Sequence, residues 1–152
     1  MILIFEITES NLFSECMHQS LIDVQNLRDE QGRALTNEQA ISSRNIDIFH
    51  TALMSELATL YSLFANKITW QLSGNDVLKF DVNCDRRGCE HDALVGSIAL
   101  TLKDWLKYKL LAWWNMSKNS ALNAMYLSKA DEVRSNLIHL ISNEVERPYR
   151  YW

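Results

Sequence analysis

The chain has 152 residues, of which 47% are hydrophobic and 22% are charged, and its formal net charge at neutral pH is −4. This length is typical of one domain that buries its core without disulfides or metal. The acidic balance excludes a general electrostatic attraction to nucleic acid. Three irregularly spaced cysteines do not describe a disulfide framework, and no basic leader or long apolar run predicts secretion or membrane insertion.

The first residues are β-branched and aromatic, and they predict a short strand or an extended N-terminal arm over about residues 1–9. Ser10 is a candidate N-cap for a helix that follows. The apolar residues of that helix are Leu12, Phe13, Cys16, Met17, Leu21 and Val24.

A polar segment separates this region from the next apolar pattern. Thr36 and Gln39 have the spacing of a capping box, so a helix begins there or later, near Asn45. The periodic residues of the predicted helix are Ile46, Phe49, Leu53, Leu57, Leu60 and Phe64. Two β-prone runs, 68–72 and 77–82, then flank a Gly-Asn turn and predict a β-hairpin.

Two long helical patterns occupy most of the C-terminal half, on either side of Asn115–Ser120. Their apolar residues recur every three or four positions, which predicts an antiparallel helical hairpin. Leu100, Leu111 and Trp114 fall on the polar arc of the first helix at 100° per residue, so we expect them to face a second subunit. The tail is rich in the residue types of interface anchors, and we expect it to dock on a neighbour. Its members are Arg147, Pro148, Tyr149, Arg150, Tyr151 and Trp152.

Few residues suggest metal or acid–base chemistry. Cys84, Cys89 and His91 form C-x4-C-x-H and are weak candidates for a zinc site, because structural zinc sites usually have C-x2-C pairs. The alternative is a polar loop with incidental thiols. His50 lies one helical turn from Asp47, but such pairs are common on any polar helix face. No nucleotide-binding, nucleophile-elbow or zinc-protease motif occurs, so the sequence predicts no enzyme and no cofactor.

The order of features from Ile46 to Trp152 resembles small structural proteins from the morphogenesis clusters of tailed phages, especially those of Bacteroides-type bacteria and their prophages. In these proteins an amphipathic helix, here 46–61, precedes a β-like segment, here 68–72. A long helix that ends in aromatic residues follows, here 104–114. An Arg-Pro-containing tail, here 146–152, closes the chain. The class is that of head-to-tail connectors, or neck proteins.

This resemblance implies a non-enzymatic virion protein, made in the bacterial host cytoplasm, whose copies form a homo-oligomeric ring. The implied partners are the portal protein and tail-side neck proteins, and DNA passes through the lumen without sequence-specific binding. The predicted fold is a mainly α single domain over residues 1–152, with three or four helices, a long C-terminal helical hairpin and a small β-hairpin or extended arm. The alternative is a helical regulatory or nucleic-acid-binding module that gathers Lys103, Lys107, Arg147 and Arg150 on one surface.

Overall fold

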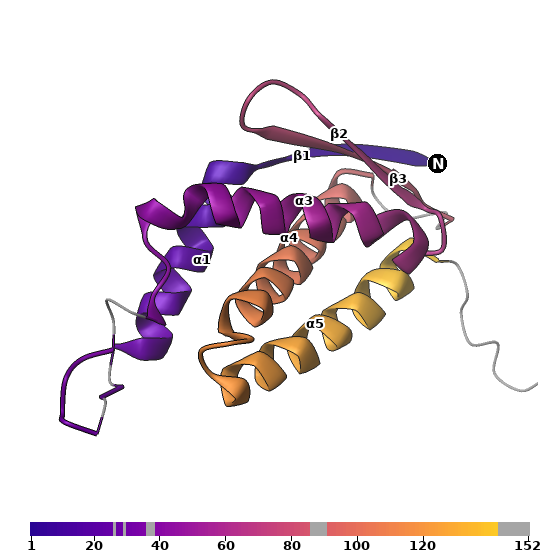
Figure 1. Ribbon diagram of the computed structural model, residues 1–152. Coiled ribbons are helices and arrows are strands. Elements are labelled where there is room, and N and C mark those ends of the chain that lie inside the picture. The colour runs from indigo at the N-terminus through magenta and orange to yellow at the C-terminus, as the bar shows by residue number, and fades with distance from the viewer. Residues whose placement is uncertain (26, 29, 36–38, 86–90, 143–152) are drawn as a thin grey trace, which may run out of the picture.

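The computed structural model describes residues 1–25, 27–28, 30–35, 39–85 and 91–142. In chain order the elements are β1 (Ile2–Thr8), α1 (Glu9–Val24), the 3-10 helix η1 (Ser43–Asn45), α3 (Ile46–Leu63), β2 (Ile68–Leu72), β3 (Val77–Asn83), α4 (His91–Asn115) and α5 (Ser120–Ile141). The prediction of a mainly helical chain with a small β element is confirmed (Figure 1). None of the described helices is long and apolar enough to cross a membrane.

The three strands form one antiparallel sheet in the order β1-β3-β2. Residues 2–8 are therefore a strand of the sheet and not a free arm. Because side chains alternate across a strand, Leu3, Phe5 and Ile7 turn into the core while Ile2 and Ile4 face outward. The predicted hairpin between β2 and β3 is confirmed, with Gly74 at φ +84° in its turn.

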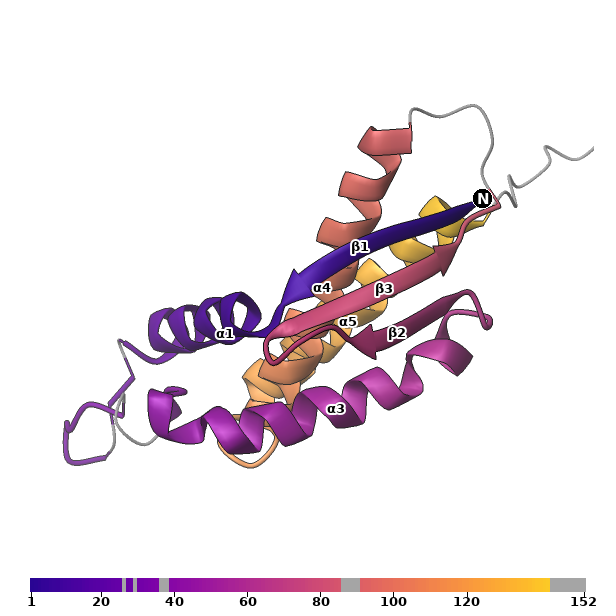
Figure 2. The same cartoon turned by 90° about the horizontal axis from the view of Figure 1, so that it is seen from above.

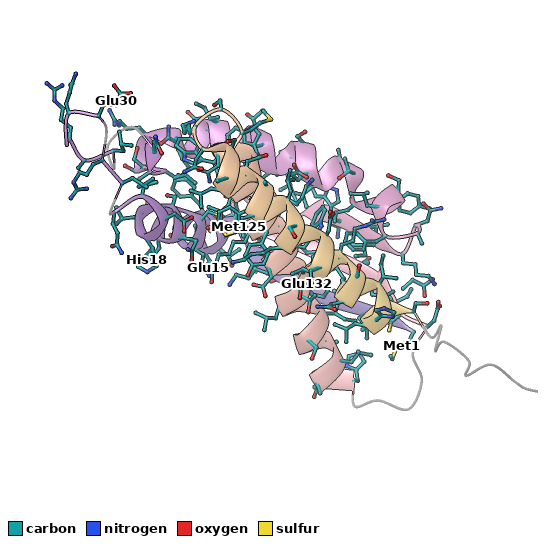
Figure 3. All side chains as sticks on the ribbon, turned by 90° about the horizontal axis from the view of Figure 1, so that it is seen from below. Met1, Glu15, His18, Glu30, Met125 and Glu132 are labelled. Atoms are coloured by element: carbon teal, nitrogen blue, oxygen red, sulfur yellow. The ribbon has the colours of Figure 1, made fainter. Side chains whose placement is uncertain are left out.

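Helix α4 lies in the middle of the molecule. It crosses beneath the sheet, runs beside α5, and contacts α1 and α3 (Figures 1 and 2). The underside is formed by α5, which carries Met125 and Glu132, with α1 beside its first half (Figure 3). The sheet and the described helices α1, α3, α4 and α5 thus share one apolar core.

Aromatic pairs link the layers of this core. The rings of Phe64 and Trp105 meet edge to face with centroids 5.3 Å apart, which joins the end of α3 to α4. Phe5 stacks on Phe80 at 5.4 Å within the sheet. Such pairs stabilise beyond the area that they bury, so the contacts between layers are specific as well as apolar.

Helix beginnings differ in detail from the sequence prediction. Helix α1 begins at Glu9 after Thr8, so Ser10 lies within its first turn and is not the N-cap, and its hydroxyl donates to Asp76 at 2.6 Å. Ahead of α3, Ser42 and Asn45 form a capping box around η1. The predicted box that starts at Thr36 lies outside the described residues. At the other end of the chain, the Asn119 side chain caps α5 by accepting from the N–H of Leu122 at 3.1 Å.

Candidate functional site

A hollow of about 470 Å³ lies where α3, β2, β3 and α5 all end or begin. We call it the α5-end hollow. Its lining residues are Phe64, Ala65, Lys67, Asp85, Ile138, Ile141 and Ser142. Its volume lies in the range of pockets that hold small ligands. It is the place from which the chain continues into residues 143–152, which lie outside the described residues.

The turn from α3 into β2 forms one wall of this hollow. The N–H of Phe64 bonds to the carbonyl of Leu60 at 3.1 Å, and the N–H of Asn66 bonds to that of Tyr61 at 2.7 Å. Ala65 and Asn66 both have positive φ, +54° and +63°. Two consecutive left-handed residues end the helix and redirect the chain at a cost of about 1–2 kcal/mol for alanine. The turn thereby places Phe64 and Ala65 beside the end of α5.

Backbone bonds tie the other walls together. Asp85 donates its N–H to the carbonyl of Ile141 at 2.9 Å, and the Cys84 thiol lies 3.7 Å from the carbonyl of Leu140. Lys67 and Asp85 form an ion pair at the rim. The hollow therefore offers an apolar wall next to a carboxylate, an arrangement that suits an aromatic or aliphatic group attached to a cation.

A second, smaller hollow of about 220 Å³ has both apolar and polar walls. The polar side chains of its lining are Glu9, Ser10, Asp47, His50, Asn75 and Asp76. His50 Nδ1 lies 2.5 Å from Glu9 Oε1, and Ser10 donates to Asp76 through both its hydroxyl and its backbone N–H. Serine and histidine thus bond to different carboxylates, so no nucleophile–base pair forms. The cluster connects α1 to α3 and to the β2–β3 turn, which gives it a structural role. Sequence reasoning missed it, because it paired His50 with a neighbour on its own helix.

The predicted contact residues separate into three groups. Leu111 and Trp114 are buried within the subunit, so the prediction that they lie on its surface and face a second subunit is wrong. The Trp114 indole donates to the carbonyl of Gln39 at 2.6 Å, which shows that the segment before η1 covers this part of α4. Leu100 is exposed, as expected. Arg147–Trp152 lie outside the described residues.

The cysteine and histidine candidates do not converge in the described part of the chain. Cys84 is buried, His91 is exposed and lies 3.4 Å from Asp92, and Cys89 is not among the described residues. Within the described ranges, no three His, Cys, Asp or Glu side chains are placed to hold a metal ion. Burial raises the pKa of the Cys16 thiol to about 12, although Lys107 lowers it, so this cysteine is an unreactive core residue.

Two of the lysines on α4 are paired with acidic groups. Lys103 Nζ lies 2.7 Å from Glu15, and Lys109 Nζ lies 3.9 Å from Glu56. Burial raises the pKa of Glu56, and Lys109 partly offsets that effect. These carboxylates weaken the local positive potential, which does not favour a nucleic-acid interface on this helix.

The comparisons with known proteins add no constraint: a scan of protein-family models, a search of curated proteins and a search of solved structures found no match.

Proposed function

We propose that this protein is a non-enzymatic, ring-forming head-to-tail connector of a phage particle, which joins the portal to the tail and lets DNA pass. The family assignment rests on the resemblance of residues 46–152 to neck proteins. The observation that supports ring assembly is the α5-end hollow. It is lined by Ser142, a few residues before the aromatic and basic tail in the sequence. In this proposal α4 and α5 are the helical hairpin that holds the hollow in place.

The chemistry of the hollow matches the chemistry of the tail. Ile138 is partly exposed beside buried Phe64 and Ile141, so an entering aromatic ring would cover apolar surface. Asp85 stands at the rim, where Lys67 pairs with one of its carboxylate oxygens. The carboxylate still has acceptor positions that a guanidinium could use. The tail supplies two arginines, two tyrosines and a tryptophan.

A contact between a tail and a hollow joins unlike surfaces of two copies. Such heterologous contacts repeat in one sense and close into a ring when the rotation per subunit allows it. Leu100 on α4 is a further exposed apolar residue and is proposed as part of the contact with a neighbour. The net charge of −4 fits a lumen that does not grip DNA phosphates.

The test compares two aspartate substitutions on the same face of α5. Ile138 and Leu127 are similarly exposed, 38% and 41%, and lie about 16 Å apart along the helix, but only Ile138 lines the hollow. The full-length chain, Ile138→Asp, Leu127→Asp and a variant lacking 147–152 are examined by sedimentation and electron microscopy, alone and with portal rings. We expect rings or portal complexes from the full-length chain and Leu127→Asp, and at least a tenfold loss from the other two.

Three outcomes would contradict the proposal. The full-length chain would form nothing larger than a dimer, alone or with portal. Leu127→Asp would lose assembly as much as Ile138→Asp. The isolated subunit would shift labelled DNA in a salt-dependent way, which would favour the nucleic-acid-binding alternative.

A further inference from the structure

The outer edge of β1 has no strand beside it in the described part of the chain. The strand order places β1 at one side of the sheet, with β3 as its one neighbour. Figure 2 shows β1 as the outermost strand, while the first turns of α4 extend past it from below. Met1 lies at the same end of the molecule as the last turn of α5 (Figure 3).

The hydrogen bonds at the two ends of β1 define which backbone groups point outward. Met1 exchanges bonds with Cys84 at 2.8 and 3.2 Å, and the N–H of Glu9 bonds to Asp76 at 2.8 Å. Both are pairs in the same register as β1 and β3. Since bonded pairs alternate in an antiparallel ladder, odd-numbered residues of β1 bond to β3. The N–H and C=O groups of Ile2, Ile4, Glu6 and Thr8 therefore point away from the sheet.

This edge lacks the features that normally prevent strand pairing. It is seven residues long with continuous register, and it contains no proline and no lysine. Its one charge, on Glu6, lies opposite Lys79 in the register with β3. Ile2 and Ile4 are exposed on its outer face. A regular, apolar edge of this length is a site at which another strand adds.

We propose that β1 pairs antiparallel with β1 of a second copy, about a two-fold axis at Phe5, so that two sheets become one of six strands. In a continuous sheet, residues that lie opposite each other on paired strands point to the same face. The buried odd residues therefore pair with odd residues, and the outer even residues pair with even ones. Outward-pointing backbone groups belong to the even residues, which form the bonded pairs. A two-fold arrangement gives each copy the same donors and acceptors.

The sequence of β1 selects the axis. Centring on Phe5 pairs all seven residues: Ile2 with Thr8, Leu3 with Ile7, and Ile4 with Glu6. Centring on Glu6 would place two carboxylates directly opposite each other, which is destabilising. Centring on Ile4 leaves Thr8 without a partner. With Phe5 on the axis, the buried row of β1 continues into that of the second copy, and the two Phe5 rings meet at a closely spaced pair.

This inference goes beyond the proposed function. A two-fold contact closes on itself and cannot by itself propagate a ring, and it uses β1 and not the α5-end hollow. Loss of one contact therefore leaves the other measurable.

Two proline substitutions on opposite edges of the sheet test the pairing. The N–H of Ile4 points away from β3, so Ile4→Pro removes a bond to the second copy and none within the sheet. Leu72→Pro is the matched control. It lies on the opposite edge strand, β2, with an exposed fraction of 54% against 53% for Ile4. Its N–H also points away from β3, because Ser73 bonds to Val77 and Asn83 bonds to Lys67.

Sedimentation equilibrium of the full-length chain and of each variant gives the dissociation constant of the dimer. Circular dichroism checks that each variant is folded. We expect a dimer whose dissociation constant rises at least tenfold in Ile4→Pro and stays within twofold in Leu72→Pro. If either proline variant unfolds, Ile4→Lys and its control Ile48→Lys replace the pair. Ile48 lies on α3 and has an exposed fraction of 54% against 53% for Ile4. A monomeric wild type, or an unchanged dimer in the Ile4 variant, overturns the proposal.

Hydrogen exchange supplies a second readout that needs no variant. Pairing protects the N–H groups of Ile2, Ile4 and Glu6 as protein concentration rises, and leaves those of Trp70 and Leu72 on the other edge unchanged. Concentration-independent exchange on β1 would overturn the pairing even if the chain forms larger rings through its tail.

Discussion

Tyr126 is a buried tyrosine on α5 whose hydroxyl donates to the Asp23 carboxylate on α1. A hydrogen bond to a charged group contributes about 1.5–3 kcal/mol, so we expect Tyr126→Phe to lower the free energy of unfolding by about that amount. Tyr61→Phe is the control, because Tyr61 is exposed on α3 and should lose less than about 0.5 kcal/mol. Urea denaturation of both variants measures the difference, and equal losses would contradict the role of the bond.

The same residue gives a pH dependence. Burial raises the pKa of Tyr126, and the hydrogen bond and the charge of Asp23 raise it further. An unfolded tyrosine loses its proton near pH 10, whereas folded Tyr126 keeps it, so the folded state binds more protons above that pH. Stability from this group is therefore complete below about pH 10 and is lost as the pH rises. The difference between wild type and Tyr126→Phe should shrink in the same range.

At the scale of elements, the segment before η1 connects α1 to the end of α4. Trp114 donates to the carbonyl of Gln39, and the N–H of Ile41 bonds to the Ser20 hydroxyl at 2.9 Å. Trp114→Phe keeps a ring in the core but removes the donor, which leaves a carbonyl unpaired at a cost of about 1–3 kcal/mol. We expect faster hydrogen exchange at residues 39–41 in this variant, and no such change in Trp113→Phe, a half-buried neighbour. Uniformly faster exchange over the whole chain would contradict a local link.

Local sequence patterns predicted which segments are helices and which are strands. They did not predict which residues are buried by segments that are distant in the sequence. The 3.6-residue period of α3 and α4 and the β-prone runs around Gly74 are local signals, and the structure has these elements there. Whether residues 2–8 would be a strand or an arm depended on β3, some 75 residues away. Trp114 looked exposed because part of its cover comes from the stretch at Gln39, which has no helical or strand period. The α5-end hollow could not be predicted, because four element ends meet there only in the fold.

At the scale of the whole molecule, α4 contributes to one core shared by the sheet and the helices, so the chain should unfold as a unit. Leu102 is fully buried in that core, and Leu102→Ala should lower the free energy of unfolding by about 2–5 kcal/mol. Native-state hydrogen exchange should report the same loss at amides of β3 and of α5, which lie on opposite sides of α4.

Leu100→Ala is the matched control two residues away, because its exposed side chain leaves no cavity when it is shortened. We expect a change below about 0.5 kcal/mol in the free energy of unfolding of the subunit, so any loss of ring assembly by this variant is a loss of contact and not of folding. A fall at β3 without a fall at α5 in Leu102→Ala would show two independent units. The β1 edge and the α5-end hollow would then no longer be held in a fixed relation by one core.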